Sequence, residues 1–192
     1  MMFYYGDIGL EVPENMYYPQ EDSLLLAKSL EKLECKGKKC LEIGCGSGFL
    51  SILMAKEGAV VTSADINKDA VASATRNSSK NDVNVEALDS DLFGKIDGKF
   101  DLIVFNPPYL PVDDKYAHES YDGGKTGRAV IGRFLEGAKD HLTVNGKVLL
   151  LISSLTGEKE VIDFAKSCGF TTEVLAREKI DWEELIVLGL QG

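Results

Sequence analysis

Residues 40–48 read CLEIGCGSG and decide the fold class of this chain. The first four form an apolar strand interrupted only by Glu42, and glycines at positions 44, 46 and 48 follow before the apolar segment 49–57. Glycines between a buried strand and a helix allow a tight turn and let a ligand approach the main chain closely. The segment therefore predicts the first strand, the ligand-binding loop and the first helix of an open α/β sheet.

The segments that follow this loop alternate between strand and helix patterns. The strongest strand is Phe100–Phe105, FDLIVF, a nearly continuous apolar run typical of a strand buried on both faces. Such alternation predicts a doubly wound, mostly parallel sheet with helices on both faces. We expect helices over 21–33, 49–57, 68–78, 129–141 and 157–167, and strands over 40–43, 60–64, 83–88, 100–105, 148–152, 172–176 and 185–190. The last two strands have no helix between them, so we expect them to pair antiparallel.

Length and composition restrict the class of protein. The 192 residues fit one domain over 1–192, and the net charge of -10 argues against unaided nucleic-acid binding, although a local basic patch could oppose it. No segment approaches the ~20 apolar residues that span a bilayer, and the first residues lack the basic start of a signal peptide. The four cysteines form no CxxC pair and have no histidine at metal-ligand spacing. We expect a cytoplasmic protein that binds no metal.

Three acidic residues follow three successive strands. Glu42 precedes the first glycine, Asp65 closes the strand 60–64, and Asp91 follows the strand 83–88. The loop has the spacing GxGxG with Phe49 where a dinucleotide site would place its last glycine, and Glu42 would repel phosphates but attract a cation. S-adenosylmethionine carries a sulfonium and an amino group and no phosphate. It is therefore the predicted cofactor.

These acids have distinct predicted roles. Asp65 would accept hydrogen bonds from both ribose hydroxyls, and Asp91 would accept one from the adenine amino group while Leu92 packs on the ring. Taken one at a time, the glycine loop could be only a tight turn and the three acids only solvated loop residues. An acid associated with each of three successive strands favours a cofactor site instead. The later glycine-rich segment 123–128 is not a phosphate-binding loop, because that pattern needs glycine at position 119, which is glutamate.

Asn106-Pro107-Pro108-Tyr109 follows directly on the strand Phe100–Phe105. A planar NH2 nitrogen is a poor nucleophile because its lone pair is delocalised. Two acceptors on its hydrogens, the Asn106 side-chain oxygen and a main-chain carbonyl, would favour a pyramidal nitrogen that can attack. The two prolines would hold that carbonyl in place, and Tyr109 would offer an aromatic face to the planar group. A rigid turn is the alternative for these four residues in isolation.

With these motifs in view, the sequence resembles the class I S-adenosylmethionine-dependent methyltransferases. More narrowly it is similar to the HemK/PrmC-type protein-glutamine methyltransferases, in their short archaeal and eukaryotic branch. The resemblance begins at Tyr18-Pro19-Gln20-Glu21-Asp22-Ser23 and continues through the glycine loop, the acids and the Asn-Pro-Pro-Tyr turn to Gly123-Gly124 and Gly127-Arg128. Ser23 stands where threonine is frequent, and the hydroxyl is kept.

The resemblance implies a Rossmann-like, seven-stranded sheet whose seventh strand is antiparallel. It implies that residues 1–35 are an N-terminal extension and helix that pack over the cofactor site. The implied substrate is the glutamine of the Gly-Gly-Gln loop of a class I peptide release factor. The branch also works with a small zinc-binding activator subunit, for which the apolar edge strand Val83–Leu88 is the candidate docking site. The cofactor-binding residues so assigned are Ser23, Glu42, Gly44, Gly46, Asp65, Asp91, Leu92 and Asn106; the catalytic residues are Asn106, Pro107 and Tyr109; and the substrate-binding residues are Asn106, Pro107, Pro108 and Tyr109.

Other acceptors of the methyl group remain open at this point. Adenine N6 and cytosine N4 present a similar planar NH2, although the acidic charge and the lack of room for a recognition domain speak against them. A lysine nitrogen would need deprotonation instead of release of a lone pair. A silent cofactor-binding scaffold would have no need of the two acceptors in the turn. Two interpretations remain for the Tyr116–Tyr121 stretch within the long segment 106–128. It could form a lid over the substrate, or it could be part of a disordered loop.

Overall fold

A computed structural model of the chain describes residues 1–109 and 127–192. Most of the predicted long loop over 106–128 therefore lies outside the described residues. The same holds for the glycine pair at 123 and 124 and for the Tyr116–Tyr121 stretch.

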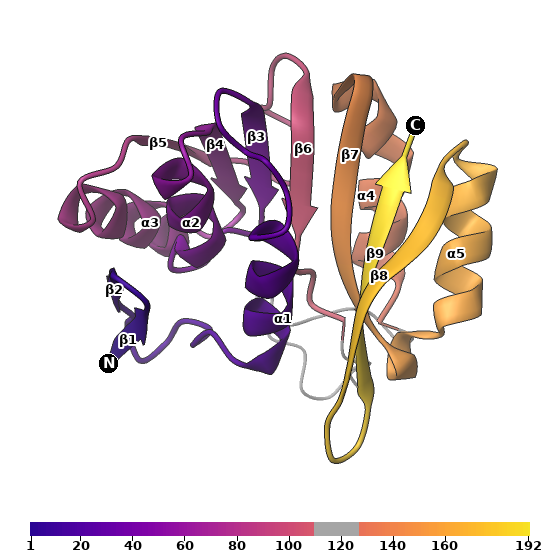
Figure 1. The fold of residues 1–192 in the computed structure, drawn as a ribbon, viewed down its shortest axis with the longest axis horizontal. Helices are drawn as coiled ribbons and strands as arrows, with labels where there is room; N and C mark the ends of the chain where they lie inside the picture. The colour runs from indigo at the N-terminus through magenta and orange to yellow at the C-terminus, as the bar shows by residue number, and fades with distance from the viewer. Residues whose placement is uncertain (110–126) are drawn as a thin grey trace.

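A seven-stranded sheet forms the centre of the molecule, in the order β5-β4-β3-β6-β7-β9-β8 (Figure 1). Neighbouring strands from β5 to β7 are parallel, whereas β9 is antiparallel to both β7 and β8. The expected mostly parallel sheet and the antiparallel last pair are thus confirmed. The strands are β3 (Lys39–Ile43), β4 (Val60–Asp65), β5 (Val85–Asp89), β6 (Phe100–Phe105), β7 (Leu142–Ser153), β8 (Thr171–Lys179) and β9 (Glu184–Gln191).

Helices cover both faces of this sheet, as expected. Alternation along each strand sends Leu102 and Val104 of β6 to one apolar cluster and Ile103 and Phe105 to the other. The first cluster includes residues of α1 (Glu21–Leu30), α2 (Phe49–Lys56) and α3 (Lys68–Lys80), and the second includes residues of α4 (Ala129–Ala138) and α5 (Glu158–Ser167). Short 3-10 helices, η1 (Lys139–His141) and η2 (Ser154–Thr156), flank β7.

Several predicted boundaries were wrong. α1 ends at Leu30 and not at 33, β5 begins at Val85 and not at 83, and β7 begins at Leu142 and not at 148. Asn145-Gly146 has the composition of a turn, yet Gly146 lies within β7, where an added Cβ would come within 2.8 Å of the Phe100 carbonyl. Close passage of β6 thus explains the glycine.

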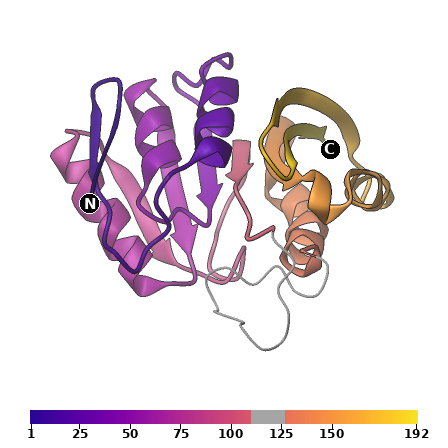
Figure 2. The same cartoon turned by 90° about the horizontal axis from the view of Figure 1, so that it is seen from below.

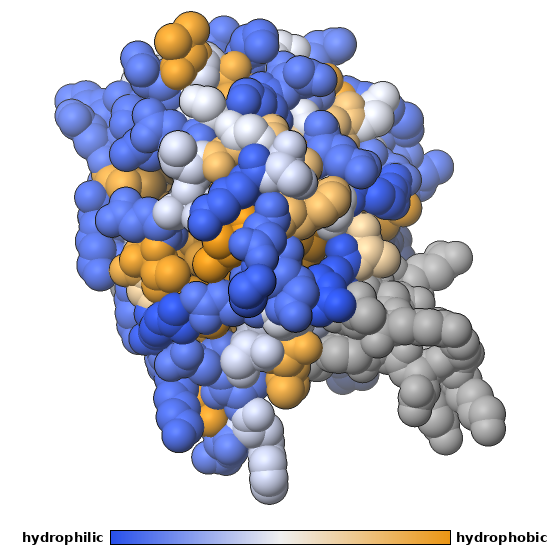
Figure 3. Space-filling view, turned by 90° about the vertical axis from the view of Figure 1, so that its right-hand side faces the viewer, coloured by the Kyte–Doolittle hydropathy of each residue, from blue (hydrophilic) through white to orange (hydrophobic). Residues whose placement is uncertain are grey.

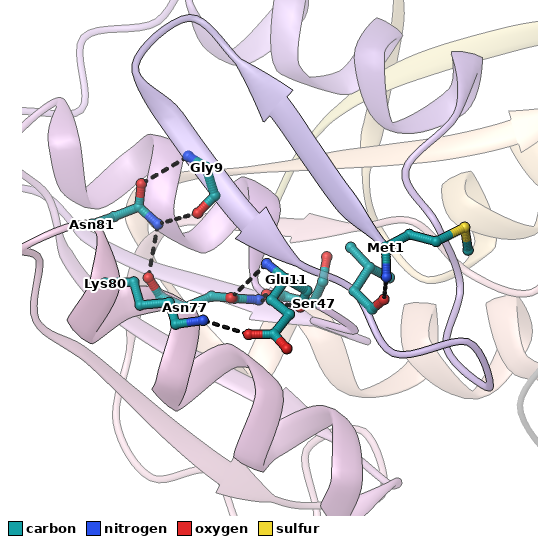
Figure 4. Close-up of polar contacts among 8 residues, drawn as sticks. Met1, Gly9, Glu11, Ser47, Asn77, Lys80 and Asn81 are labelled. Carbon is teal, nitrogen blue, oxygen red and sulfur yellow. Dashed lines mark hydrogen bonds and ion pairs between the residues drawn. The ribbon is translucent and has the colours of Figure 1, made fainter.

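A hairpin of β1 (Met2–Tyr5) and β2 (Ile8–Glu11) precedes the main sheet and was not predicted. Asn77 of α3 and Asn81, the residue that follows the end of this helix, bind the outer edge of β2 (Figure 4). The Asn81 side chain accepts from the Gly9 N–H at 3.1 Å and donates to the Gly9 carbonyl at 2.9 Å. Asn77 does the same with Glu11, at 3.0 and 3.1 Å, and also donates to the carbonyl of Ser47 at 2.9 Å. Asn77 therefore links the hairpin to the glycine loop.

The surface over α5 and β8 is largely hydrophilic, with apolar residues showing between the charged ones (Figure 3). The apolar side chains exposed on these two elements include Phe164, Val174 and Leu175. Among the described residues, no helix is long and apolar enough to cross a membrane.

Candidate active site

A cavity of about 1060 Å³ opens at the carboxyl ends of β3, β4 and β6, the edge toward which Figure 2 looks. Its lining comes from the ends of these strands and the loops that follow them, from the loop after β5, from the segment before α1, from the starts of α1, α2 and α3, and from α4. All the residues predicted for the cofactor and the substrate line it: Ser23, Glu42, Gly44, Gly46, Asp65, Asp91, Leu92, Asn106, Pro107, Pro108 and Tyr109. Residues far apart in the sequence thus converge on one space.

The glycine loop needs its glycines for different reasons. Gly44 has a φ of +69°, and an added Cβ would lie 3.3 Å from the ring of Phe105. Gly48 has a φ of +84° and packs on α3, where a Cβ would lie 2.9 Å from Cα of Ala74. Nothing lies within 4 Å of the Cβ position of Gly46, which lines the cavity. The loop is therefore held close to α3 and the sheet while its main chain at Gly46 stays open to a ligand.

Glu42 is buried and bound to the start of α2. Its carboxylate accepts from the Ser51 N–H at 2.8 Å and from the Ser51 hydroxyl. Burial raises the pKa of Glu42 to about 8, which the two Ser51 hydrogen bonds only partly oppose. A cation in the cavity would favour the ionised form, so binding of a positive ligand and loss of this proton are coupled.

Asp65 lies at the end of β4 and holds the loop from the other side. One carboxylate oxygen accepts from the Gly46 N–H at 3.0 Å, and the other accepts from the Asn67 N–H at 2.9 Å. Burial raises the pKa of Asp65, and these main-chain hydrogen bonds oppose that effect. Since a carboxylate has about four acceptor positions, each oxygen retains capacity for a ligand hydroxyl.

Asp91 forms an ion pair with Arg133 of α4, at 2.7 Å, that the sequence did not suggest. Both side chains are about half exposed, so the pair contributes little to stability. Its importance is geometric, because Arg133 restrains a carboxylate at the cavity wall. Leu92, the next residue, has a φ of +47°.

The Asn106 side chain is oriented by residues of α1. Its Nδ2 donates to Oδ2 of Asp22 at 3.1 Å and to the Ser23 hydroxyl at 3.4 Å. Its Oδ1 is buried and has no hydrogen-bond partner within 1–109 and 127–192. A buried acceptor without a donor costs roughly 1–3 kcal/mol, and a ligand that brings an N–H to this point would recover it.

Two tyrosines join the same cluster. The Tyr109 hydroxyl donates to Oδ2 of Asp22 at 3.3 Å, and the Tyr17 hydroxyl donates to Oδ1 at 2.5 Å. Burial and, after it, the charge of Asp22 raise the pKa of both phenols, so each remains a neutral donor. The sequence motif at 18–23 contains Asp22, but only Ser23 was given a role, and Tyr17 was not singled out.

Comparison with known proteins agrees with this geometry. The family model described as the methyltransferase small domain matches residues 20–181. The chain belongs to this family. The methyltransferase also shares 46% identity over 187 residues with a protein of Methanocaldococcus jannaschii named provisionally as a protein N5-glutamine methyltransferase, covering 94% of each chain.

Two further relatives are also methyltransferases. The release factor glutamine methyltransferase of Lactococcus lactis is 34% identical over 167 residues, which cover 80% of this chain and 62% of that one. Among solved structures, the Mtq2–Trm112 complex of E. cuniculi, described as responsible for methylation of the eRF1 translation termination factor, superimposes with a TM-score of 0.74 at 30% identity. The match covers 91% of this chain and 97% of that one. The resemblance to the HemK/PrmC-type methyltransferases is confirmed.

S-adenosylmethionine is the cofactor of this methyltransferase fold, and the cavity fits it. The open main chain at Gly46, the spare acceptor positions of Asp65 and the buried carboxylate of Glu42 suit a ligand with hydroxyls and positive charge and no phosphate. These features support the charge argument made from the sequence.

Proposed function

We propose that this enzyme methylates the side-chain N5 nitrogen of a glutamine in a class I peptide release factor, at the Gly-Gly-Gln loop. The observation that carries the proposal is on Asn106, a residue that lines the cavity, whose buried Oδ1 has no hydrogen-bond partner among the described residues. An acceptor in that position binds a group that brings N–H donors, and a glutamine amide brings two. The names of the relatives from M. jannaschii and L. lactis support the same acceptor.

The cofactor would supply a methyl group on a positively charged sulfur. Glu42, Gly44, Gly46 and Asp65 would hold it, with Ser23, Asp91, Leu92 and Asn106 completing its contacts. In the family, the residue at the position of Asn106 contacts both the cofactor and the substrate. Asn106 could do both here, because it binds the Ser23 hydroxyl and lines the cavity.

On the acceptor side, Oδ1 of Asn106 and the Pro107 carbonyl would each accept one hydrogen of the amide NH2. This favours a pyramidal nitrogen with a free lone pair and stabilises its developing positive charge. The ring of Pro108 fixes the backbone before the substrate arrives. Tyr109 would pack against the planar amide. The proton leaves after the nitrogen has become cationic, so no strong base is needed in the turn.

The partner and the setting are also proposals. β5 is one of the two edge strands of the seven-stranded sheet, and a docking site for a small activator subunit requires such an edge. The E. cuniculi relative was solved in complex with Trm112, which supports an activator here, and we propose that it is a small zinc-binding protein. A release factor as substrate would place the enzyme in the cytoplasm. Asn15, Met16 and Tyr17 line the cavity, in support of the proposal that the segment 1–35 packs over the cofactor.

The test is transfer of a labelled methyl group from S-adenosylmethionine, with and without the activator, to release factor, to release factor whose loop glutamine is replaced by alanine, and to DNA. We expect label only on the unaltered release factor, and mass spectrometry of its peptides to locate the methyl group on that glutamine. Label on DNA with none on release factor would refute the proposal. If the alanine variant of the release factor is still labelled, the methyl acceptor is another residue, such as a lysine.

A further inference from the structure

Asp22 is a buried carboxylate at the acceptor end of the cavity to which neither the sequence pattern nor the chemistry above gives a role. It is only 4% exposed and belongs to the first turn of α1. A buried carboxylate is costly unless its oxygens are well satisfied by donors. Here the donors are the hydroxyls of Tyr17, Tyr109 and Ser23, the main-chain N–H of Ser23, and Nδ2 of Asn106.

The contact with Asn106 decides how its amide is turned. With Nδ2 facing Oδ2 of Asp22 at 3.1 Å, Oδ1 is the amide atom of this cavity-lining residue that is left without a partner among the described residues. The flipped amide would place Oδ1 against the carboxylate oxygen, two acceptors at hydrogen-bond distance, one of them charged. It would also turn the NH2 group toward the substrate. Asp22 therefore makes one of the two amide orientations strongly unfavourable.

The Ser23 hydroxyl supports the same orientation. It donates to Oδ1 of Asp22 at 3.2 Å, so its oxygen is free to accept from Nδ2 of Asn106 at 3.4 Å. Tyr109 also donates to Asp22, and Thr156 donates to the Tyr109 carbonyl at 3.3 Å. Both residues that flank the two prolines are thus tied to the carboxylate by their side chains.

We propose that Asp22 is a positioning residue that fixes the amide of Asn106 with its oxygen toward the acceptor, and so makes this end of the cavity selective for an NH2 donor over a carboxylate. The selectivity part rests on the proposed glutamine methylation. A glutamate of the same shape would bring only acceptors to Oδ1 of Asn106 and would place a negative charge near Asp22. A glutamine would bring the hydrogens that Oδ1 lacks.

The variant Asp22→Asn keeps the shape and removes the constraint. An asparagine at 22 can accept from Nδ2 of Asn106 or donate to its Oδ1, so both amide orientations become possible. We expect kcat on release factor to fall on the order of 100-fold, the scale of losing one preorganised dipole, while the Kd for S-adenosylmethionine changes far less. Asp101→Asn is the matched control, because Asp101 binds Lys39 N–H and the Thr143 hydroxyl on other elements, away from the cavity. It should leave kcat unchanged.

Two readouts separate orientation from a general structural role. The first is binding of peptides with glutamine or glutamate at the acceptor position, in the presence of S-adenosylhomocysteine. The wild type should prefer glutamine by at least about tenfold, and Asp22→Asn should narrow that preference. The second is NMR of protein labelled with 15N-asparagine, in which Asn106→Asp identifies the Asn106 side-chain NH2 signals. Exchange of these hydrogens with water should be slow in the wild type and faster in Asp22→Asn.

The outcomes distinguish this inference from the proposed function. If the wild type methylates no release factor but the Asn106 NH2 signals respond to Asp22→Asn, the proposed substrate fails and the positioning role stands. If release factor is methylated and Asp22→Asn changes neither kcat nor the NH2 exchange, the positioning role is refuted. Loss of kcat together with an equal loss of cofactor affinity and of thermal stability would reduce Asp22 to a structural residue.

Discussion

Replacement of Glu42 by glutamine should stabilise the cofactor-free enzyme at neutral pH while it weakens cofactor binding. The carboxyl group is buried, and its pKa is raised from the ordinary value of 4.5 to about 8. The folded protein therefore binds this proton more tightly than the unfolded chain does. Stability from this group is fully present below pH 4.5 and is lost as the pH rises toward 8, because only the unfolded chain ionises freely in that interval.

The size of the effect follows from the displaced pKa. At 1.36 kcal/mol per pH unit, the free energy of unfolding of the wild type falls by about 3 kcal/mol between pH 4.5 and 7, and by about 4 kcal/mol by pH 8, where the folded protein has itself begun to ionise, relative to a chain that lacks the group. A glutamine can still accept from Ser51 N–H and its hydroxyl through Oε1. Any cost of its extra NH2 is constant with pH, so the pH-dependent part of the difference isolates the carboxyl group.

Urea unfolding of both proteins without cofactor at pH 5, 6, 7 and 8 measures this difference. The stability of Glu42→Gln relative to the wild type should increase steadily over the series. Parallel pH profiles for the two proteins would refute the assignment of a raised pKa to Glu42. Titration calorimetry adds a second check, since S-adenosylmethionine should lose more affinity for the variant than S-adenosylhomocysteine, which lacks the sulfonium charge.

Four further substitutions test the site and the segments that support it. Asn106→Ala should lower kcat at least about 100-fold in the methyl-transfer assay while the Kd for the cofactor rises less than tenfold, and unchanged turnover would contradict its role. Asn77→Ala and Asn81→Ala should each lower the free energy of unfolding by about 2 kcal/mol in urea, because each leaves main-chain groups of β2 unpaired. Of the two, only Asn77→Ala should weaken cofactor binding, since Asn77 alone binds the Ser47 carbonyl, and equal effects would show that the loop does not need this contact. Gly44→Ala should lower the free energy of unfolding by about 1–2 kcal/mol in urea, because Gly44 has a positive φ. It should also weaken cofactor binding measured by calorimetry, because the added Cβ contacts the ring of Phe105.

The parts of the fold that follow from local patterns were predictable. Phe100–Phe105 is apolar on both faces because it lies in the middle of the sheet between β3 and β7, and that position is visible in its composition. The hairpin of β1 and β2 has a signal that could have been used, the possible two-residue turn Gly6-Asp7 that follows a short run rich in aromatic residues. Its docking on α3 has no local signal, because asparagine side chains on a helix usually face water.

The meeting of Glu42, Asp65 and Asp91 at one cavity was predictable for a similar reason. Glu42 and Asp65 lie at the carboxyl ends of β3 and β4, Asp91 follows β5, and the carboxyl ends of parallel strands meet at one edge. Arg133 was missed because it approaches Asp91 from α4, 42 positions later in the chain. Nothing in the periodicity of either segment records such a pair, and only the packing of α4 on the sheet creates it.

The acceptor side shows why a four-residue motif says less than the structure. Asn106 to Tyr109 alone describe a rigid turn whose amide could face either way. Asp22, 84 positions earlier, removes that ambiguity by taking the NH2 group of Asn106, and it also binds the hydroxyl of Tyr109. The chemistry proposed for the turn, two acceptors aimed at one nitrogen, therefore depends on where α1 begins and how it packs against β7, β8 and β9. A chain that carried the same four residues without a carboxylate at this point would lose the fixed orientation, and with it the reason to prefer an amide.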